Sequence, residues 1–368
     1  MSRICRSLAS TLPIELVGVI ASLVKYKSRS NALASLLFLN KHWHHSIANT
    51  PLLFDQVDLV PEMTYRAVSQ LLALSQQLPL SVALDYSDIS AICTSNTISH
   101  ASLLASQASR IAIFRLSCET PDTAFIMFKA FADVEWQSLN LVAIYTPSRM
   151  LWTIWDLELF FKWLRLASPT LGALNIQGGL VHDGNTLSLS PTEFTRLRKF
   201  TYRGPQYSRD WDIFCNVPGL RTLKFLSIEH RLLYPIFDLI SSHSHLRLMK
   251  LIIHSNIFNM SPDVNGNPPW IKLSRACPKI TDLRLPTPYE TFLVLLAHDH
   301  SVWPFLKDLA FFRGPSDFSL ISELVNSRFD TNSKLRQIRI VGDWEVEELR
   351  ALRLRVDIQV WSRHQLET

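Results

Sequence analysis

The chain has 368 residues, of which 47% are apolar and 19% are charged, and its formal net charge is +5. This composition can bury a substantial core and excludes a disordered, low-complexity chain. No run of about 18 uncharged apolar residues occurs, so the sequence predicts neither a transmembrane helix nor a membrane partner.

Charge, glycine content and cysteine usage indicate which ligands are not expected and which cellular compartment is. Lys and Arg are spread along the chain, so no nucleic-acid partner is expected from charge alone. Only 10 Gly are present, which argues against phosphate-cradling loops. The cysteines are odd in number and none forms a C-x-x-C pair: Cys5, Cys93, Cys118, Cys215 and Cys277. This pattern predicts free thiols in a reducing compartment, cytoplasmic and/or nuclear.

Residues 1–10 are expected to be an N-terminal tail. Arg3 and Arg6 precede an apolar run, as in a targeting peptide. Pro13 and Glu15 interrupt that run, however, and no small-residue cleavage site follows Val24. We therefore expect the tail to lead directly into a helical segment.

The segment 11–54 has the pattern of two or three short amphipathic helices. Pro13 suits a first helical turn, where Glu15 complements the helix dipole. One face of this helix is predicted to carry Leu12, Leu16, Ile20, Leu23 and Val24. A second helix, capped by Ser30 or Asn31, is predicted to run to Asn49. Its common face would carry Leu33, Leu36, Leu37, Asn40, Trp43 and Ile47.

From residue 54 onward, one spacing of apolar residues recurs. The pattern is an anchor, two variable positions, an anchor, one variable position and an anchor. It begins at Phe54, Ile111, Leu139, Leu171, Leu197, Leu220, Leu246, Ile280, Leu306 and Leu335, with a weaker copy at Leu80-x-Val82-x-Leu84. A period of this size predicts a repeat protein, or solenoid.

A helical pattern follows most copies. The predicted helices are 63–77, 97–109, 122–132, 157–167, 232–241, 289–298, 318–328 and 344–352. Strands alternating with helices also fit a plain α/β domain with a parallel sheet. The repeat is favoured, because a doubly wound sheet would show longer and more continuously apolar strands.

The N-terminal segment resembles the F-box motif. The resemblance rests on Leu12-Pro13-x-Glu15-Leu16, on Leu39-Asn40-Lys41-x-Trp43 and on the exit Pro51-Leu52-Leu53-Phe54. It covers about 45 residues, and it departs from the motif between the helices, where Lys25, Lys27 and Arg29 replace the usual turn. Residues 55–368 resemble an irregular leucine-rich repeat, without the Asn or Cys that usually follows its strand.

Together these resemblances imply an α/β protein with a small helical F-box at 11–54. An irregular leucine-rich-repeat-like solenoid would follow at 55–368, with a curved parallel sheet and helices outside. They imply a substrate receptor of an SCF-type (cullin–RING) E3 ubiquitin ligase, with no catalysis of its own and no cofactor. The F-box would bind the small adaptor subunit, which bridges to the cullin scaffold. The implied adaptor contacts, or their support, are Leu12, Pro13, Leu16, Ile20, Leu36, Leu39 and Trp43. The alternative for some of them, Trp43 above all, is packing against the first repeat.

The variable positions of the strands predict a substrate surface. In a strand, alternate residues point to opposite faces, so the positions between anchors would face the ligand. Bases outnumber acids there, which favours an acidic or phosphorylated protein substrate. The predicted contacts are Arg203, Lys224, Lys250, Arg284, Phe312 and Arg339. The alternative is a solvated strand surface without a ligand.

Motifs for an enzyme are missing from the sequence. His42 to His45 and His298-Asp299-His300 are dense in histidine, but we expect surface or capping roles for them and no metal. No G-x-S-x-G and no H-E-x-x-H is present. Three other functions stay open: a leucine-rich-repeat scaffold outside a ligase, a hydrolase or transferase on an α/β fold, and a basic solenoid that binds nucleic acid.

Overall fold

The computed structural model describes residues 12–27, 36, 39–87, 94–146, 154–178, 194–203, 224–229, 247–254, 269–287, 290–312, 318–329, 334–341 and 346–361. The chain divides into two compact units, Met1–Thr146 and Pro147–Thr368. Each unit is described below by itself.

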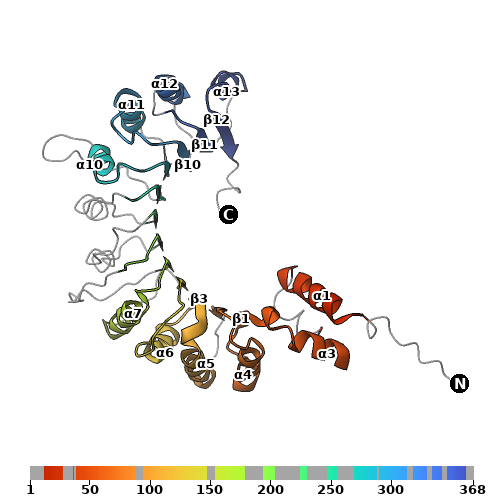
Figure 1. Ribbon diagram of the computed structural model, residues 1–368. Helices are drawn as coiled ribbons and strands as arrows, with labels where there is room; N and C mark the ends of the chain where they lie inside the picture. The colour runs from red at the N-terminus through yellow and green to blue at the C-terminus, as the bar shows by residue number, and fades with distance from the viewer. Residues whose placement is uncertain are drawn as a thin grey trace. The chain divides into compact units, whose positions relative to one another are not determined.

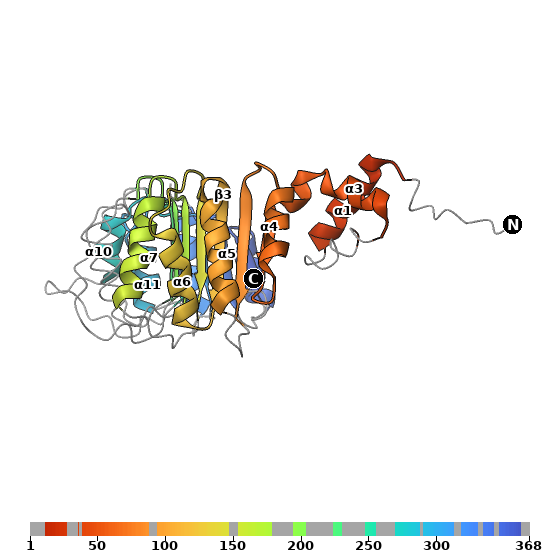
Figure 2. The same cartoon turned by 90° about the horizontal axis from the view of Figure 1, so that it is seen from below.

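The first unit begins with helices and continues as strand–helix repeats (Figure 1). Its helical start consists of α1 (Ile14–Lys27), α3 (Lys41–Ala48) and the 3-10 helix η2 (Pro51–Phe54). The repeats comprise β1 (Gln56–Leu59), α4 (Tyr65–Leu74), β2 (Leu80–Tyr86), α5 (Thr94–Ser106), η3 (Ala108–Arg110), β3 (Ile111–Cys118), α6 (Pro121–Phe131) and β4 (Leu141–Tyr145). Figure 2 shows α4, α5 and α6 side by side along this unit.

The second unit repeats the same strand–helix alternation. Its elements are α7 (Ile154–Ala167), β5 (Ala173–Gln177), β6 (Lys199–Arg203), β7 (Phe225–Glu229), β8 (Lys250–Ile253), α10 (Pro269–Ala276), β9 (Asp282–Leu285), α11 (Glu290–His298), β10 (Asp308–Phe311), α12 (Phe318–Phe329), β11 (Gln337–Val341), α13 (Val346–Arg353) and β12 (Asp357–Trp361). The helices of this unit lie on one face of its strands, as Figure 1 shows.

Within each unit the strands follow one another in the order of the sequence, β1 to β4 in the first and β5 to β12 in the second. Neighbouring strands within each unit are parallel. A doubly wound sheet would instead reverse its strand order at a switch point. The prediction of an α/β, solenoid-like repeat with a parallel sheet is therefore confirmed.

Most of the predicted helices are present. Those expected from 63, 97, 122, 157, 289, 318 and 344 correspond to α4, α5, α6, α7, α11, α12 and α13, with ends that differ by a few residues. The helix expected at 232–241 lies outside the described residues. The helix α10 is not among the helices that the sequence predicted.

The apolar anchors form the core between strands and helices. In β3, for example, Ile111, Phe114 and Leu116 are fully buried, as are Ile280, Leu283 and Leu285 around β9. The anchors point away from the variable positions because successive strand residues alternate between the two faces. Each repeat alone would leave its anchors exposed, so stacking of neighbours is what buries them.

Two repeats have a different register from the one predicted. In the first of them, anchors were expected at Leu220, Leu223 and Phe225. In the structure the neighbouring anchor Phe200 pairs with Leu226, and Leu226 is the buried residue. In the next repeat Met249 was expected to be an anchor, but it is 45% exposed, whereas Leu248 is buried. The anchors there are Leu248, Leu251 and Ile253. Both stretches contain the same apolar spacing twice, and only pairing with the neighbouring strands selects one copy.

The predicted second N-terminal helix is also wrong in one respect, because α3 begins only at Lys41. Asn40 has an extended backbone (φ −168°, ψ 172°), and its side chain accepts a hydrogen bond from the Trp43 amide at 3.0 Å. An Asn side chain that caps in this way starts a helix and cannot continue a preceding one. Asn40 is therefore a cap and no part of a helical face.

Within the described ranges, no helix is both long enough and apolar enough to cross a membrane.

Candidate functional site

The N-terminal helices share a core with the first repeat. This core consists of Val17 and Ala21 of α1, Trp43 and Ile47 of α3, and Leu53 and Phe54 of η2. Leu71 and Leu74 of α4 pack against it, together with Leu12, Ile20 and Leu36. Nε2 of His42 also hydrogen bonds to the Leu12 carbonyl oxygen at 2.7 Å, which ties the start of α1 to α3. The helical segment is thus continuous with the repeat in its packing.

The opposite side of these helices leaves large apolar side chains in solvent. Leu16, Val19 and Leu23 follow at steps of three and four, so they share one face of α1. They are 49%, 55% and 59% exposed. Ile14, Leu39 and Leu52 are exposed as well. Exposed apolar side chains that gather on one face are typical of a protein-binding surface.

The predicted adaptor residues divide into two groups. Pro13, Leu16 and Leu39 are exposed and can contact a partner directly. Leu12, Ile20 and Leu36 are half-buried against the shared core, and Trp43 is 4% exposed. Trp43 is therefore part of the core that the helices share with the first repeat, and it is too buried to be a large direct contact.

The second candidate surface is the polar face of unit 2, defined as the face of β5–β12 that lies opposite the anchors. Of the predicted substrate residues, Arg203, Lys250, Arg284 and Arg339 are on this face, and Phe312 comes directly after β10. Lys224 is not. It precedes β7, and its amide donates to the Arg198 carbonyl oxygen at the edge of the sheet. The corrected registers add Phe225, Ser227 and His254, which the second copy of the apolar spacing would have revealed.

Opposite charges and an aromatic ring already interact across β6 to β9. The ammonium groups of Lys199 and Lys250 lie 5.1 and 5.6 Å from the centre of the Phe225 ring, within the range of cation–π attraction. Asp282 accepts from both sides: its carboxylate is 2.8 Å from Lys250 Nζ and 3.3 Å from Arg284 Nε. One carboxylate, that of Asp282, thus pairs with two of the predicted basic residues, Lys250 and Arg284.

His254 occupies the centre of the polar face. Its ring stacks on Phe312 at 4.8 Å and 9°, and Nε2 lies 3.3 Å from the Ser227 hydroxyl. Burial, together with the positive charges of Arg203 and Arg284, lowers the pKa of His254 to about 4. The imidazole is therefore neutral near pH 7, and it acts here as a packed aromatic ring.

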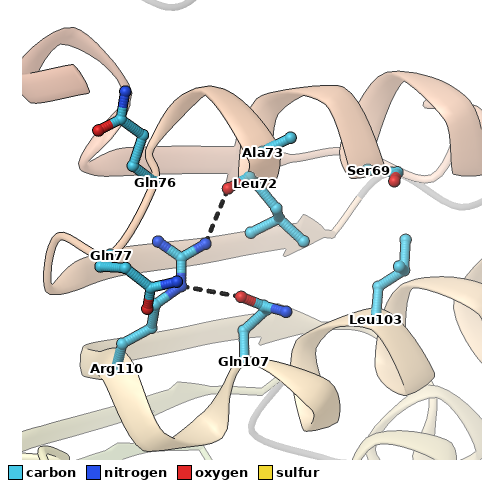
Figure 3. A pocket seen from close by; sticks show the side chains of 8 residues that line it. All are labelled: Ser69, Leu72, Ala73, Gln76, Gln77, Leu103, Gln107 and Arg110. Carbon is cyan, nitrogen blue, oxygen red and sulfur yellow. Dashed lines mark hydrogen bonds between the residues drawn. The ribbon is translucent and has the colours of Figure 1, made fainter.

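Unit 1 contains a groove of about 320 Å³ between α4 and α5. Its lining is mostly polar, with Ser69, Gln76, Gln77, Gln107 and Arg110 beside Leu72, Ala73 and Leu103 (Figure 3). The Arg110 guanidinium donates to the Leu72 carbonyl oxygen at 2.8 Å, to Ser75 Oγ at 2.9 Å and to Gln107 Oε1 at 2.8 Å. The one cation of the groove is thus engaged with the end of α4.

Candidate catalytic and metal-binding groups are dispersed in the described part of the chain. No group of three His, Cys, Asp or Glu side chains is placed there to hold a metal ion. Burial raises the pKa of the thiols of Cys118 and Cys277 to about 12. Asp299 accepts from the Ser301 amide at 2.9 Å, and His298 pairs with Glu323 at 2.9 Å. These are the capping and surface roles expected for the His298–His300 stretch.

Neither the family models nor the curated proteins with which the sequence was compared include a match to this chain.

Proposed function

We propose that this chain is the substrate receptor of an SCF-type E3 ubiquitin ligase. Its N-terminal helices would bind the adaptor subunit that bridges to the cullin scaffold, and its repeats would bind a protein substrate. The proposal combines the resemblance of residues 11–54 to the F-box with the apolar face of α1. It assigns the chain no reaction of its own and no cofactor, because a receptor acts by raising the effective concentration of its substrate.

The observation that carries the proposal is the exposure of Leu16, Val19 and Leu23. Val17 and Ala21 on the same helix are completely buried, so α1 packs on one side only. Because these three side chains are about half exposed, their burial by a partner would contribute roughly 2–5 kcal/mol of transfer free energy, less the cost of association. A helical docking face of this kind is what the adaptor contact requires.

For the substrate we propose the polar face of unit 2. Arg203, Arg284 and Arg339 supply planar donors that suit carboxylates or phosphates. An acidic or phosphorylated ligand would compete with Asp282 for Lys250 and Arg284. His254 and Phe312 add a flat aromatic surface beside these charges.

Purification of the full chain together with adaptor and cullin tests the proposal. The variant Leu16→Ala/Val19→Ala/Leu23→Ala should reduce adaptor recovery at least about tenfold, because each truncation removes about 1 kcal/mol or more at an interface. A matched control truncates exposed apolar residues elsewhere: Ile98→Ala/Val294→Ala/Leu354→Ala. Equal adaptor recovery by both variants would show that α1 is not the docking face.

The same purification separates the ligase from a second candidate, a repeat scaffold outside a ligase. That candidate has support of its own, because the polar face of unit 2 and the apolar face of α1 would each suit a protein partner without a ligase. Recovery of the adaptor without a cullin would favour the scaffold. Recovery of both supports the receptor.

A further inference from the structure

Exposed basic side chains gather along one edge of the sheet in unit 2. From β6 to β12 they occupy one or both of the positions that flank the first anchor of a repeat, close to the start of its strand, and Asp357 is the one acid at these positions. We call this set the basic stripe: Arg196, Arg198, Lys224, Arg247, Lys279, Lys307, Lys334, Arg336 and Arg355. In the sequence these residues are spread over 160 positions (196 to 355), so the fold alone brings them into one row.

Backbone hydrogen bonds set the order of the basic stripe. The Lys224 amide donates to the Arg198 carbonyl oxygen at 2.9 Å, and the Arg336 amide donates to that of Lys307 at 2.7 Å. Met249 and Thr281 continue the same ladder between Lys224 and Lys307. Since parallel strands are about 4.8 Å apart, consecutive residues of the ladder, such as Lys307 and Arg336, are close neighbours. The row from β6 to β12 crosses six such intervals, or about 29 Å.

The charges of the basic stripe are not neutralised within the described part of unit 2. None of the nine side chains forms an ion pair with a carboxylate there. Arg355 donates to Asn326 and lies over the Phe329 ring, and Lys334 lies over the same ring at 4.2 Å. These contacts leave the positive charge in place, so the edge carries an unbalanced field.

Helix dipoles do not account for the basic stripe. Helices end near the same edge, and bases stabilise helix carboxyl termini. Unit 1 provides an internal control, because α4, α5 and α6 end in the same way before β2, β3 and β4. The flanking positions there are Pro79, Ser81, Arg110, Ala112, Ser138 and Asn140. Only Arg110 is basic, and it is engaged with α4, so the repeat folds without a basic stripe.

We propose that the basic stripe binds an acidic protein segment that also carries apolar side chains. Among its flanking positions, Met249 and Phe305 are large, apolar and 45% and 57% exposed. Arg, Met and Phe, which all occur along this row, are enriched at protein interfaces. Single-stranded nucleic acid would instead need a series of aromatic side chains for base stacking, and Phe305 is the one aromatic at these positions. An extended segment of about nine residues spans the row.

This inference deepens the substrate side of the proposed function and uses no property of the N-terminal helices. It is tested on the full chain without adaptor, by fluorescence anisotropy with a labelled peptide of repeated Glu-Glu-Leu. The wild-type chain should bind this peptide, and a Gln-Gln-Leu peptide should bind at least about tenfold more weakly. Loss of adaptor binding would leave this result unchanged, so the two proposals fail separately.

Variants locate the binding. Lys307→Glu/Arg336→Glu reverses two neighbours of the ladder and should weaken binding at least about tenfold. Arg66→Glu/Lys129→Glu changes the net charge equally on exposed helix positions of unit 1 and should bind like the wild type. If the double Glu variant does not fold, Lys307→Gln/Arg336→Gln takes its place, and its loss of peptide affinity should be smaller.

Three outcomes would overturn the inference. One is equal weakening by the stripe variant and the unit 1 variant, which would indicate net charge alone. Another is equal binding of the Glu and Gln peptides. The third is binding of an oligothymidylate that is tighter than that of the Glu-Glu-Leu peptide, which would assign the edge to nucleic acid.

Discussion

Arg328 is a fully buried side chain that closes the end of a neighbouring helix. Its guanidinium donates to the carbonyl oxygens of Leu296 and Val302 at 2.8 Å and of Trp303 at 3.3 Å. Trp303 has a positive φ of 47°, which turns the chain after α11 toward the arginine. Burial lowers the pKa of Arg328 to about 10, so the group remains charged at neutral pH. It replaces the backbone partners that a helix end lacks.

Replacing Arg328 with Met should lower the free energy of unfolding by about 2–4 kcal/mol, because three buried carbonyl oxygens lose their donors. Arg110→Met is the matched control. Arg110 makes the same kind of contacts to α4 but is partly exposed, so water can substitute and about 1 kcal/mol is expected. Urea denaturation of both variants measures the difference. Equal losses would show that burial of the carbonyl oxygens is not the cause.

His254 predicts a dependence of stability on pH. Its pKa is about 4 in the folded chain and about 6.5 when unfolded. Between these values the unfolded chain binds a proton that the folded chain does not, so stability falls as pH decreases from about 6.5 to about 4. In His254→Gln this part of the decrease should be absent.

Thermal denaturation across that pH range measures the effect, and the slope matters more than the absolute stability. His44→Gln, which removes an exposed histidine, is the control for the loss of an imidazole side chain. A slope in His254→Gln as steep as in the wild type would contradict the prediction.

At the scale of single elements, the register of β7 and β8 can be tested with adjacent residues. Leu226→Asn and Leu248→Asn place an amide in the core and should cost about 3 kcal/mol or more. Phe225→Asn and Met249→Asn change the adjacent residues, which the predicted register had made anchors. Each should cost about 1 kcal/mol or less, including the cation–π contacts of Phe225. The denaturant midpoints of the four variants decide the register. Larger losses in the Phe225 and Met249 variants than in the Leu226 and Leu248 variants would support the register predicted from the sequence.

The same two strands show how far sequence reasoning reaches. Repeat period, strand–helix alternation and most anchors follow from apolar spacing, because a buried face must be apolar in every repeat. The stretches around Phe225 and Met249 contain that spacing twice. Local sequence cannot choose between the copies, since the choice is made by hydrogen bonds to β6 and β9. The error of register then misplaced Lys224 and hid His254 on the candidate surface.

The N-terminal site was predictable to a similar extent. Leu16, Ile20 and Leu23 were identified, whereas Val17, Val19 and Ala21 were not. The division into exposed contacts and buried support depends on which side of α1 meets the rest of the core. Leu16 and Ile20 look alike in the sequence, and only Ile20 packs on the shared core. The start of α3 depended on one capping side chain, Asn40, within a pattern that otherwise suits a longer helix.

For the whole molecule, the shared core links the N-terminal helices to the repeats. Removing residues 1–54 would uncover Leu71 and Leu74 of α4. Because a repeat contacts only its neighbours, the loss should remain local. In a truncated chain of residues 55–368, hydrogen exchange of the α4 amides should therefore be faster than in the full chain, and exchange of the α12 amides should be unchanged. Uniformly faster exchange would show that the helices stabilise the chain as a whole, and unchanged exchange in α4 would show that the shared core contributes little.

The ladder that joins Arg198, Lys224, Lys307 and Arg336 also determines where the chain can change length. A residue inserted between a first anchor and its strand would shift that strand by one position, which turns each of its side chains to the wrong face. Insertions after a strand do not disturb this phase. The connection between β8 and α10, residues 254–268, is of that kind. We therefore expect natural length variants, and foreign loops grafted by design, to be accepted at the carboxyl-terminal edge of the sheet and rejected at the amino-terminal one.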